Sequence, residues 1–495
     1  MSNVVVIGAG LAGSLLAIYL AKRGISVDVY EARGDMRKEE IVAGRSINLA
    51  LSDRGMAALR EVGMDEYMLA EAVPMYGRMI HSISGETKLL PYSGRKGEYI
   101  NSVSRAGLNI ALINEADKYD SVKFHFNKRC IDYDCRSGEL TFESGLTLTA
   151  ETVIATDGAG SAVRQAMERQ LPDFEGRSIF LEHGYKELHI PAAQASDVQP
   201  PATAGGSDKF LLEPNALHIW PRHQFMMIAL PNFDGSFTCT LFLANRSIPT
   251  AVAVGLTQPT STSRTTHNDQ PPATAAGTDI AFDELTDSAS LLDFFNREFP
   301  DAVLLMPTLA DDFFDNPTGE LGTVRCWPWN VGGKALLLGD SALAMVPFYG
   351  QGMNCAFEDV RVLDSLIEEQ AEPPASAGGF FSGFDWESIY EKYSRVRKPN
   401  TDSIQDMAEE NFYEMRDATA DPVFQRKREL ETRLEQTYPD YFSKYSMVTF
   451  REDLPYSVAK EKGNAQDRLL MEICAKENDV EGIDVESVLD KLRNL

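Results

Sequence analysis

The chain is poor in cysteine, poor in basic residues and without any long apolar run. Its six cysteines among 495 residues show no CxxC or other paired spacing, which argues against a disulfide framework and a cysteine-bound metal. This use of cysteine is typical of reduced thiols in a cytosolic protein. We therefore expect a cytoplasmic location and no metal site.

The shortage of basic residues leaves 47 Lys and Arg against 74 Asp and Glu, a formal net charge of -27. Nucleic acids and anionic membrane surfaces would be repelled by this charge. No apolar run reaches the roughly 18 to 20 residues that span a bilayer. The chain starts directly with a strand-like run at Val4–Ile7, without the look of a targeting segment. We expect no nucleic-acid partner and no membrane anchor.

Three near-identical heptapeptides interrupt the chain at residues 200–206, 271–277 and 373–379. Each lies in a stretch of Pro, Ala, Ser, Thr and Gly that has little apolar surface to bury. Their spacing is too irregular for a repeat fold. We interpret them as surface insertions without a part in the chemistry.

The first thirty residues contain a dinucleotide-binding pattern. Gly8, Gly10 and Gly13 form a GxGxxG motif between an apolar strand and an apolar helix, and Glu31 ends the next strand. Gly8 and Gly10 let the backbone approach a pyrophosphate at the positive N-terminus of the helix. Glu31 can accept hydrogen bonds from ribose hydroxyls. This motif alone leaves open which dinucleotide binds.

Two further elements favour FAD. A strand-like run over Thr152–Thr156 ends in Asp157-Gly158, and another over Ala335–Leu338 ends in Gly339-Asp340. A carboxylate at such a strand end can reach out of the sheet, and Asp340 can hold the ribityl chain. The next helix begins at Gly352, so its first N–H groups could face a flavin carbonyl and stabilise the reduced flavin.

The remaining segments complete an α/β prediction. Residues 210–243 alternate apolar and polar side chains, as antiparallel strands do, and the pattern from Trp386 onward is helical. We expect a Rossmann-like FAD-binding domain, interleaved with an antiparallel-sheet substrate domain and followed by a C-terminal helical region. The expected ranges are 1–75, 104–175 and 315–370 for the FAD-binding domain, 76–103 and 176–314 for the substrate-binding sheet domain, and 380–495 for the helical region.

The three fingerprints GxGxxG, DG and GD resemble those of the FAD-dependent aromatic hydroxylases. Within these enzymes, the chain is similar to the kynurenine 3-monooxygenase family along nearly its whole length. Matching stretches include GRSINLALS (44–52), LHIWPR (217–222), VPFYGQGMN (346–354) and NFYEMR (411–416). Such long matches are more specific than the glycine motif.

The resemblance implies an enzyme that hydroxylates L-kynurenine to 3-hydroxy-L-kynurenine with FAD, NADPH and O2, through a flavin C4a-hydroperoxide. The substrate's ring amine activates the neighbouring carbon, so no essential protein acid or base is expected. No second GxGxxG occurs, which predicts that NADPH docks transiently. The oligomeric state is left open.

The motifs and the resemblance together assign the cofactor site. The expected cofactor-binding residues are Gly8, Gly10, Leu11, Ala12, Gly13, Tyr30, Glu31, Ala32, Arg33, Arg45, Ala50, Arg105, Asp157, Asp340, Gly352, Met353 and Asn354.

The resemblance also assigns the substrate site. The residues implied to hold the amino-acid end are Arg78, Tyr99, Asn411 and Tyr445, and those implied to surround the ring are Phe242, Pro347, Phe348 and Tyr349. An arginine fork suits a carboxylate. Asn411 lies on the apolar stripe of a predicted helix, where a buried amide needs a partner. That partner can be a ligand or simply the protein core.

Two departures and three alternatives remain. Leu343 stands where many relatives carry a histidine, which could alter flavin packing, and an acidic tail stands where animal relatives have a membrane-anchoring tail. The same fold could act on another aromatic acid, which would leave the amino-acid clamp unpaired. The other two alternatives are a flavin-binding reductase or redox sensor, and a nucleotide-binding interaction protein without redox function.

Overall fold

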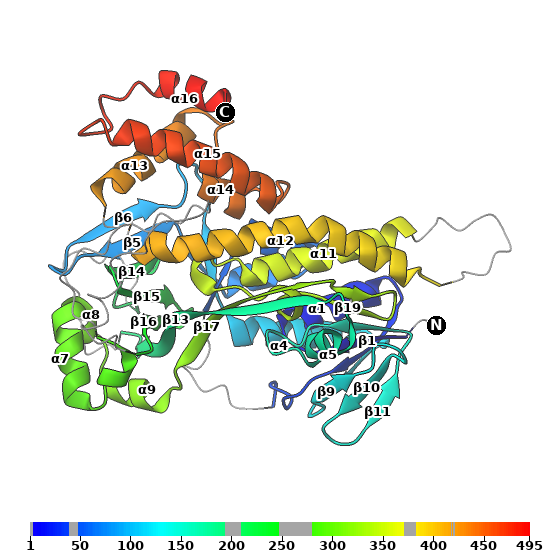
Figure 1. The fold of residues 1–495 in the computed structure, drawn as a ribbon. Helices are drawn as coiled ribbons and strands as arrows, with labels where there is room; N and C mark the ends of the chain where they lie inside the picture. The colour runs from blue at the N-terminus through cyan, green and yellow to red at the C-terminus, as the bar shows by residue number, and fades with distance from the viewer. Residues whose placement is uncertain are drawn as a thin grey trace, which may run out of the picture.

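The computed structural model describes residues 3–38, 48–193, 209–246, 280–370, 383–416, 418 and 421–495. The three heptapeptides and Arg45 lie outside these residues. Two sheet-based parts lie side by side, and the helix α12 (Trp386–Arg416) runs along both of them (Figure 1). The remaining C-terminal helices gather over one end of α12.

A six-stranded sheet holds the dinucleotide motif. Its strands follow the order β18-β19-β12-β1-β2-β8, and all neighbours are parallel except β18 and β19. Their bounds are Asn330–Val331 (β18), Ala335–Leu337 (β19), Thr152–Ala155 (β12), Asn3–Ile7 (β1), Ser26–Tyr30 (β2) and Val122–His125 (β8). The central strands are apolar because helices cover the sheet on its faces.

Helices connect these strands and bury apolar sides against them. The crossover helix α1 (Leu11–Lys22) is buried along almost its whole length, which explains why its sequence is apolar all round. The other helices of this part are α2 (Asp53–Glu61), α3 (Asp65–Ala70), α4 (Arg105–Ala116), α5 (Ala162–Gln170), α10 (Asp340–Leu343) and α11 (Gly352–Gln370).

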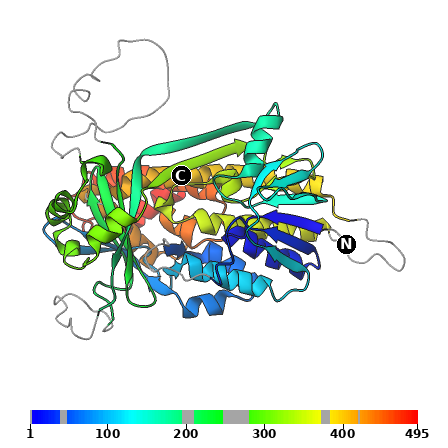
Figure 2. The ribbon, with the colours of Figure 1, turned by 90° about the horizontal axis from the view of Figure 1, so that it is seen from below.

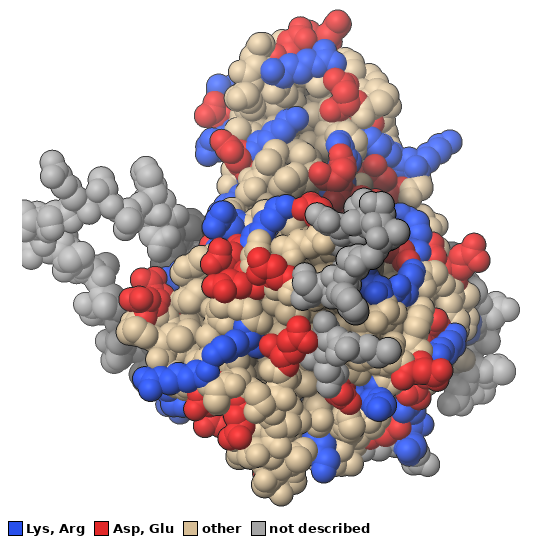
Figure 3. Space-filling view, turned by 90° about the vertical axis from the view of Figure 1, so that its right-hand side faces the viewer, with Lys and Arg blue, Asp and Glu red and all other residues tan. Residues whose placement is uncertain are grey.

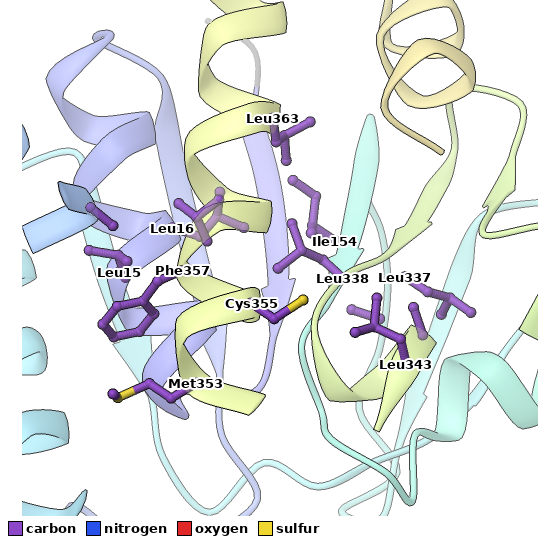
Figure 4. Packing of buried hydrophobic residues seen from close by; sticks show 14 of the residues in the cluster. Leu15, Leu16, Ile154, Leu337, Leu338, Leu343, Met353, Cys355, Phe357 and Leu363 are labelled. Atoms are coloured by element: carbon purple, nitrogen blue, oxygen red, sulfur yellow. The ribbon is translucent and has the colours of Figure 1, made fainter. Parts of the chain in front are cut away.

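Leu343 of α10 belongs to the apolar core around the six-stranded sheet. This residue is 2% exposed and packs beside Leu337 (Figure 4). It does not line the large cavity of the described structure. Leu343, at the position where the resemblance implies a histidine in many relatives, is therefore a core contact.

A seven-stranded sheet forms the second part, in the order β17-β13-β16-β15-β14-β5-β6. The bounds are Gly319–Trp327 (β17), Glu175–Ile190 (β13), Phe237–Ala244 (β16), Phe225–Pro231 (β15), Ala216–Arg222 (β14), Gly77–His81 (β5) and Thr87–Pro91 (β6). Helices α7 (Ser288–Glu298), α8 (Pro300–Val303) and α9 (Leu309–Asp315) and the 3-10 turn η1 (Phe282–Glu284) pack on it.

The strands β13 and β17 tie the two parts together. Both run as a long ribbon from the seven-stranded sheet to the dinucleotide-binding part (Figure 2). The pairing of β17 with β13 thus joins a segment expected in the FAD-binding domain to the substrate sheet. Two smaller sheets have the orders β11-β10-β9 and β3-β7-β4. Their bounds are Thr147–Thr149 (β11), Glu139–Phe142 (β10), Cys130–Tyr133 (β9), Asn48–Leu51 (β3), Ile100–Ser104 (β7) and Val73–Met75 (β4).

The C-terminal part is helical, as the sequence pattern predicts. After α12 follow α13 (Pro422–Thr437), α14 (Lys444–Thr449), α15 (Tyr456–Cys474) and α16 (Val485–Arg493). In the described ranges, none of the helices has the length and apolar character to cross a membrane. Acidic and basic side chains are interspersed on the face shown in Figure 3, so the negative excess forms no continuous patch there.

Candidate active site

A cavity of about 940 Å³ runs between the two sheets. Its size lies near the upper end of the roughly 300–1,000 Å³ typical of small-molecule pockets. One end is formed by the β1–α1 turn and the ends of β2 and β12. The other end is formed by β5, β16, the 3-10 turn η2 (Pro347–Tyr349), α12 and α14. We call these the dinucleotide end and the substrate end.

The three glycines of the motif have two different roles. A Cβ on Gly8, whose φ is +102°, would lie 2.6 Å from the carbonyl oxygen of Thr156, and a Cβ on Gly13 would lie 2.0 Å from that of Gly8. Both glycines are required for backbone packing. A Cβ on Gly10 would meet no protein atom within 4 Å, because Gly10 faces the cavity at the N-terminus of α1. That open space suits a pyrophosphate.

Glu31 is held in place for a ribose. Its Oε2 accepts a hydrogen bond from the Ala9 N–H at 2.7 Å, and its Oε1 accepts two from Arg33, through the backbone N–H at 2.9 Å and Nε at 2.8 Å. Burial raises the pKa of Glu31, but these hydrogen bonds outweigh it and the net pKa is lowered. The carboxylate stays ionised, as an acceptor for ribose hydroxyls must.

Two aspartates at strand ends face the same cavity. The Oδ2 atom of Asp157 accepts a hydrogen bond from the Ala162 N–H at 2.8 Å, while its buried Oδ1 has no hydrogen-bond partner within the described part of the chain. Burial raises the pKa of Asp340, and the guanidinium of Arg105 partly opposes this. An unpartnered carboxylate oxygen and a second carboxylate on the wall fit a ligand rich in hydroxyls, such as the ribose and ribityl groups of FAD.

The first residues of α11 meet the cavity at Gly352 and Met353, whereas the Asn354 side chain bonds to the protein. The Asn354 side chain is committed to the protein: Oδ1 accepts from the Ser52 N–H at 3.0 Å, and Nδ2 donates to the Ala50 and Gly350 carbonyls at 2.8 Å each. Asn354 is not among the residues on the cavity wall, so its contact with a cofactor stays a prediction.

Most of the expected cofactor residues come together. Those on the cavity wall are Gly8, Gly10, Leu11, Ala12, Tyr30, Glu31, Ala32, Arg33, Ala50, Arg105, Asp157, Asp340, Gly352 and Met353. Gly13 lies beneath the wall, where it packs against Gly8. Arg45 lies outside the described residues.

Arg78 marks the substrate end. It is only 8% exposed, and its Nη1 donates to Oε1 of Glu414 at 3.2 Å. Its Nε atom is buried and has no hydrogen-bond partner among the described residues. The guanidinium carbon lies 5.2 Å from the ring centre of Tyr445 and 6.0 Å from that of Tyr92. A buried guanidinium with a spare donor is a site for a carboxylate.

Aromatic residues surround the rest of this end. Phe242 and Phe348 lie with ring centres 5.0 Å apart, and Tyr349 stacks on Tyr445 at 5.7 Å. Pro347 lines the cavity beside them. These side chains can enclose an aromatic ring and keep water away from it.

Two of the expected substrate residues are not on the cavity wall as described. Asn411 donates from Nδ2 to the Phe348 carbonyl at 2.6 Å, so its amide nitrogen supports η2 from below. Tyr99 packs edge-on against Tyr76, with ring centres 5.5 Å apart, next to the wall residue Ile100. Direct contact of Asn411 or Tyr99 with a substrate stays a prediction.

Sequence reasoning missed Tyr92, Met415 and Glu414. Tyr92 and Met415 line the cavity, and Tyr92 stacks on Tyr445 at 4.9 Å. Tyr92 lies just beyond β6, so only the pairing of β6 with β5 brings it near Arg78. Glu414 follows Asn411 by three residues on one helix, which was a usable signal.

Known proteins resemble this chain at the level of sequence and of fold. Residues 1–203 match the family described as FAD binding domain. The kynurenine 3-monooxygenase of Myxococcus xanthus (strain DK1622) is 41% identical over 498 residues, covering 99% of this chain and 95% of the relative. The kynurenine 3-monooxygenase of Dictyostelium discoideum is 40% identical over 486 residues, covering 97% and 95%.

Solved structures confirm the predicted fold class. The tetrameric form of 2-methyl-3-hydroxypyridine-5-carboxylic acid oxygenase has a TM-score of 0.57 at 19% identity, covering 86% of this chain and 96% of that one. P. aeruginosa PqsL in complex with 2-aminobenzoylacetate has a TM-score of 0.59 at 16% identity, covering 84% and 97%. At these identities the likeness shows the fold alone. The full-length sequence matches, in contrast, establish that the chain belongs to the kynurenine 3-monooxygenase family.

Proposed function

We propose that this protein hydroxylates L-kynurenine to 3-hydroxy-L-kynurenine, with FAD as its cofactor, NADPH as reductant and O2 as co-substrate. One observation carries the proposal. A single cavity joins a dinucleotide-binding turn, with Gly10 and Glu31 on its wall, to a buried arginine at an aromatic-lined end. The curated relatives that align over the full length bear the name of this activity.

The residues at the substrate end bind and orient. Arg78 receives the substrate carboxylate through its unpartnered Nε, and Tyr445 lies beside it. Phe242 and Phe348 hold the aromatic ring and exclude water, which protects a reactive oxygen species from wasteful decay. Asn411 holds the Phe348 carbonyl through its hydrogen bond and so supports the ring-binding residues. The resemblance implies, in addition, a direct contact of Asn411 with the substrate.

The cofactor site supplies the redox chemistry. When bound, FAD would supply the redox chemistry that uses NADPH and O2 to transfer one oxygen atom to the ring. Gly10 would leave room for the pyrophosphate of FAD, Glu31 would accept hydrogen bonds from its ribose, and Asp340 would accept from its ribityl chain. Phe242, Pro347 and Phe348 offer no proton acceptor, so the activation of the ring is left to its own amine.

Three further assignments belong to the proposal. The FAD-binding domain comprises residues 1–75, 104–175 and 315–370. The substrate-binding sheet domain comprises residues 76–103 and 176–314, and the C-terminal helical region comprises residues 380–495. The strand β17 links the first set to the second. A cytoplasmic location is supported by six buried free thiols. Transient docking of NADPH is supported by the single GxGxxG motif.

The test is a spectrum followed by turnover. Purified protein should show the absorbance of bound flavin, and L-kynurenine should accelerate NADPH oxidation and yield 3-hydroxy-L-kynurenine by mass spectrometry. If the protein contains flavin but L-kynurenine does not accelerate NADPH oxidation, the assignment of the substrate would be refuted and that of the cofactor would stand. Acceleration by an aromatic acid without an amino-acid end, such as a benzoate, would then favour another hydroxylase of this fold. A colourless protein would refute the cofactor.

A further inference from the structure

Two neighbouring strands of the seven-stranded sheet carry buried histidines that the cavity does not use. His81 lies on β5 and His218 on β14, and neither is on the wall of the large cavity. Leu217 does line the cavity, and because successive residues of a strand point to opposite faces, His218 points away from it. On this far face Trp220 belongs to the apolar cluster formed with α7 and α8.

A chain of three hydrogen bonds runs through the two imidazoles. His81 Nδ1 lies 2.7 Å from Oδ2 of Asp301 in α8, and His81 Nε2 lies 2.8 Å from Nδ1 of His218. His218 Nε2 lies 2.8 Å from the carbonyl oxygen of Glu213. Trp220 Nε1 donates to both carboxylate oxygens of Asp301 at 3.0 Å each. The chain therefore joins β5, β14 and α8.

Both ends of this chain can only accept hydrogen bonds. The Glu213 end is a backbone carbonyl, and the other end is a carboxylate. Burial raises the pKa of Asp301, but the hydrogen bond and charge of His81 and the N–H of Trp220 outweigh this, and the net pKa is lowered. Three hydrogen bonds between two acceptor ends need three N–H groups, whereas two neutral imidazoles supply only two. The chain thus requires one more proton than neutral histidines carry.

The position of the extra proton follows from burial and charge. Burial, together with the neighbouring His81, lowers the pKa of His218 to about 3, so His218 is neutral. Its single N–H then lies on Nε2, facing Glu213, and its Nδ1 accepts from His81. His81 lies directly against the Asp301 carboxylate, where a positive ring forms an ion pair.

Two other charged residues face this unit. Arg222 of β14 donates from Nη1 to the His81 carbonyl at 3.1 Å and from Nε to the Glu298 carbonyl at 2.7 Å. Burial lowers the pKa of Arg222, while Asp301 and Glu298 act on it in the opposite direction. The positive charge of Arg222 thus also favours the ionised form of Asp301.

We propose that the folded protein stores one excess proton in the unit of Asp301, His81 and His218, as an imidazolium at His81, and that this proton ties β5 to β14 and α8. When the proton leaves, two unprotonated atoms face each other at one of the three links and that tie is lost. Because β5 is also the strand of Arg78, the unit is a pH-sensitive tie behind the substrate end. Its protonation does not depend on which reaction the cavity carries out.

The consequence is a stability that falls as the pH rises. Histidines of an unfolded chain have a pKa near 6.5, so above about pH 7 both have largely lost their extra proton. Folding then takes up one proton, and the folding equilibrium constant falls by about tenfold for each pH unit until the folded unit releases it. Below about pH 6.5 the contribution of the His81 proton is fully present.

The experiment observes the proton directly in the FAD-loaded protein, with histidine rings labelled with 15N, by magic-angle-spinning NMR at pH 8. Wild-type protein should show one imidazole with both ring nitrogens protonated, one of them in contact with an unprotonated nitrogen of a second imidazole. Asp301→Asn keeps every link with a neutral His81, because its amide N–H can donate to Nδ1 while its carbonyl oxygen still accepts from Trp220. In this variant the doubly protonated ring should disappear.

Thermal melting gives a second measurement. Between pH 7 and pH 8.5 the folding constant of the wild type should fall by roughly 30-fold relative to that of Asp301→Asn, because only the wild type loses the contribution of a stored proton. Groups that titrate alike in both proteins cancel in this ratio. The same pH dependence in both proteins would overturn the proposal.

Asp28→Asn is the matched control. Asp28 accepts from His125 Nε2 at 2.7 Å in a more exposed pair between β2 and β8, so its loss should leave the doubly protonated ring in place. A wild-type protein in which each of the seven histidines has an unprotonated ring nitrogen at pH 8 would refute the stored proton. Survival of the doubly protonated ring in Asp301→Asn would refute its dependence on the carboxylate. The wild-type spectrum decides the matter even if Asp301→Asn fails to fold.

Discussion

The two ends of the cavity are built in different ways. The dinucleotide end is made largely of backbone, and its defining residues Gly8, Gly10 and Glu31 fall within one strand-helix-strand unit. The substrate end is made of side chains from β5, β16, η2, α12 and α14, which are spread over the chain from Gly77 to Thr449. A local motif can therefore reveal the first end, whereas only the complete fold assembles the second.

The largest effects are expected from substitutions at the dinucleotide end, where Gly13 and Gly10 should respond differently. Gly13→Ala places a Cβ 2.0 Å from the Gly8 carbonyl oxygen, so it should destabilise the protein by about 3 kcal/mol or more. Gly10→Val meets only the cavity and has an extended backbone, with φ −73° and ψ −172°, that valine tolerates. It should fold with an unchanged circular dichroism spectrum and carry almost no FAD.

Gly482→Ala serves as the control, because its Cβ would make only an ordinary contact at 3.7 Å and Gly482 lies far from the cavity in the chain. Flavin absorbance after gel filtration gives the cofactor content of each variant. Normal FAD content in Gly10→Val would contradict the placement of the pyrophosphate at the start of α1.

The next largest effect is expected at the substrate end, from substitutions that should leave the dinucleotide end intact. Arg78→Ala removes one partner of a largely buried charge pair and should weaken kynurenine binding by about 2 kcal/mol, roughly 30-fold. FAD content should be unchanged, because Arg78 lies at the opposite end from Gly10. Arg78→Lys should recover only part of the affinity, since lysine keeps the charge and loses the planar fork. Unchanged affinity in Arg78→Ala would refute the clamp.

The same contrast explains what the sequence could predict. The strands, helices and glycine turn of the dinucleotide end follow from periodicity and turn chemistry, and the structure places them as expected. The helical stripe correctly turned Asn411 inward, but its partner, the Phe348 carbonyl, depends on how η2 meets α12. Tyr92 gave no signal at all, because a lone tyrosine after a strand is ordinary and only the β5–β6 pairing gives it a role.

The strand β13 shows a second limit. Its sixteen residues serve two environments: one end pairs with β16 inside the seven-stranded sheet, and the other extends with β17 toward the dinucleotide-binding part. Because the burial pattern changes along β13, its sequence resembles that of two shorter strands. Domain boundaries predicted from motifs therefore separate strands that hydrogen bonds join in the structure.

The smallest effects are expected on stability, from one threonine substitution in each of the two large sheets. Thr152 on β12 donates to the Gly333 carbonyl at 2.7 Å and shares a hydrogen bond with the Tyr390 hydroxyl at 2.7 Å. Thr240 on β16 has an equally buried hydroxyl, and the residues that the structure describes offer it no hydrogen-bond partner. Removing a satisfied buried hydroxyl costs stability, whereas removing an unsatisfied one removes an existing penalty.

Thr152→Val should therefore lower the free energy of unfolding by about 1 kcal/mol, and Thr240→Val should raise it by a similar amount. Thermal melting of the FAD-loaded protein would show shifts of opposite sign for the same chemical change. Kynurenine affinity should be unaffected in both variants, because the Thr240 hydroxyl is covered by protein even though its residue lines the cavity. A loss of affinity in Thr240→Val with unchanged melting would instead mean that the substrate reaches this hydroxyl, and that the substrate end rearranges when it is occupied.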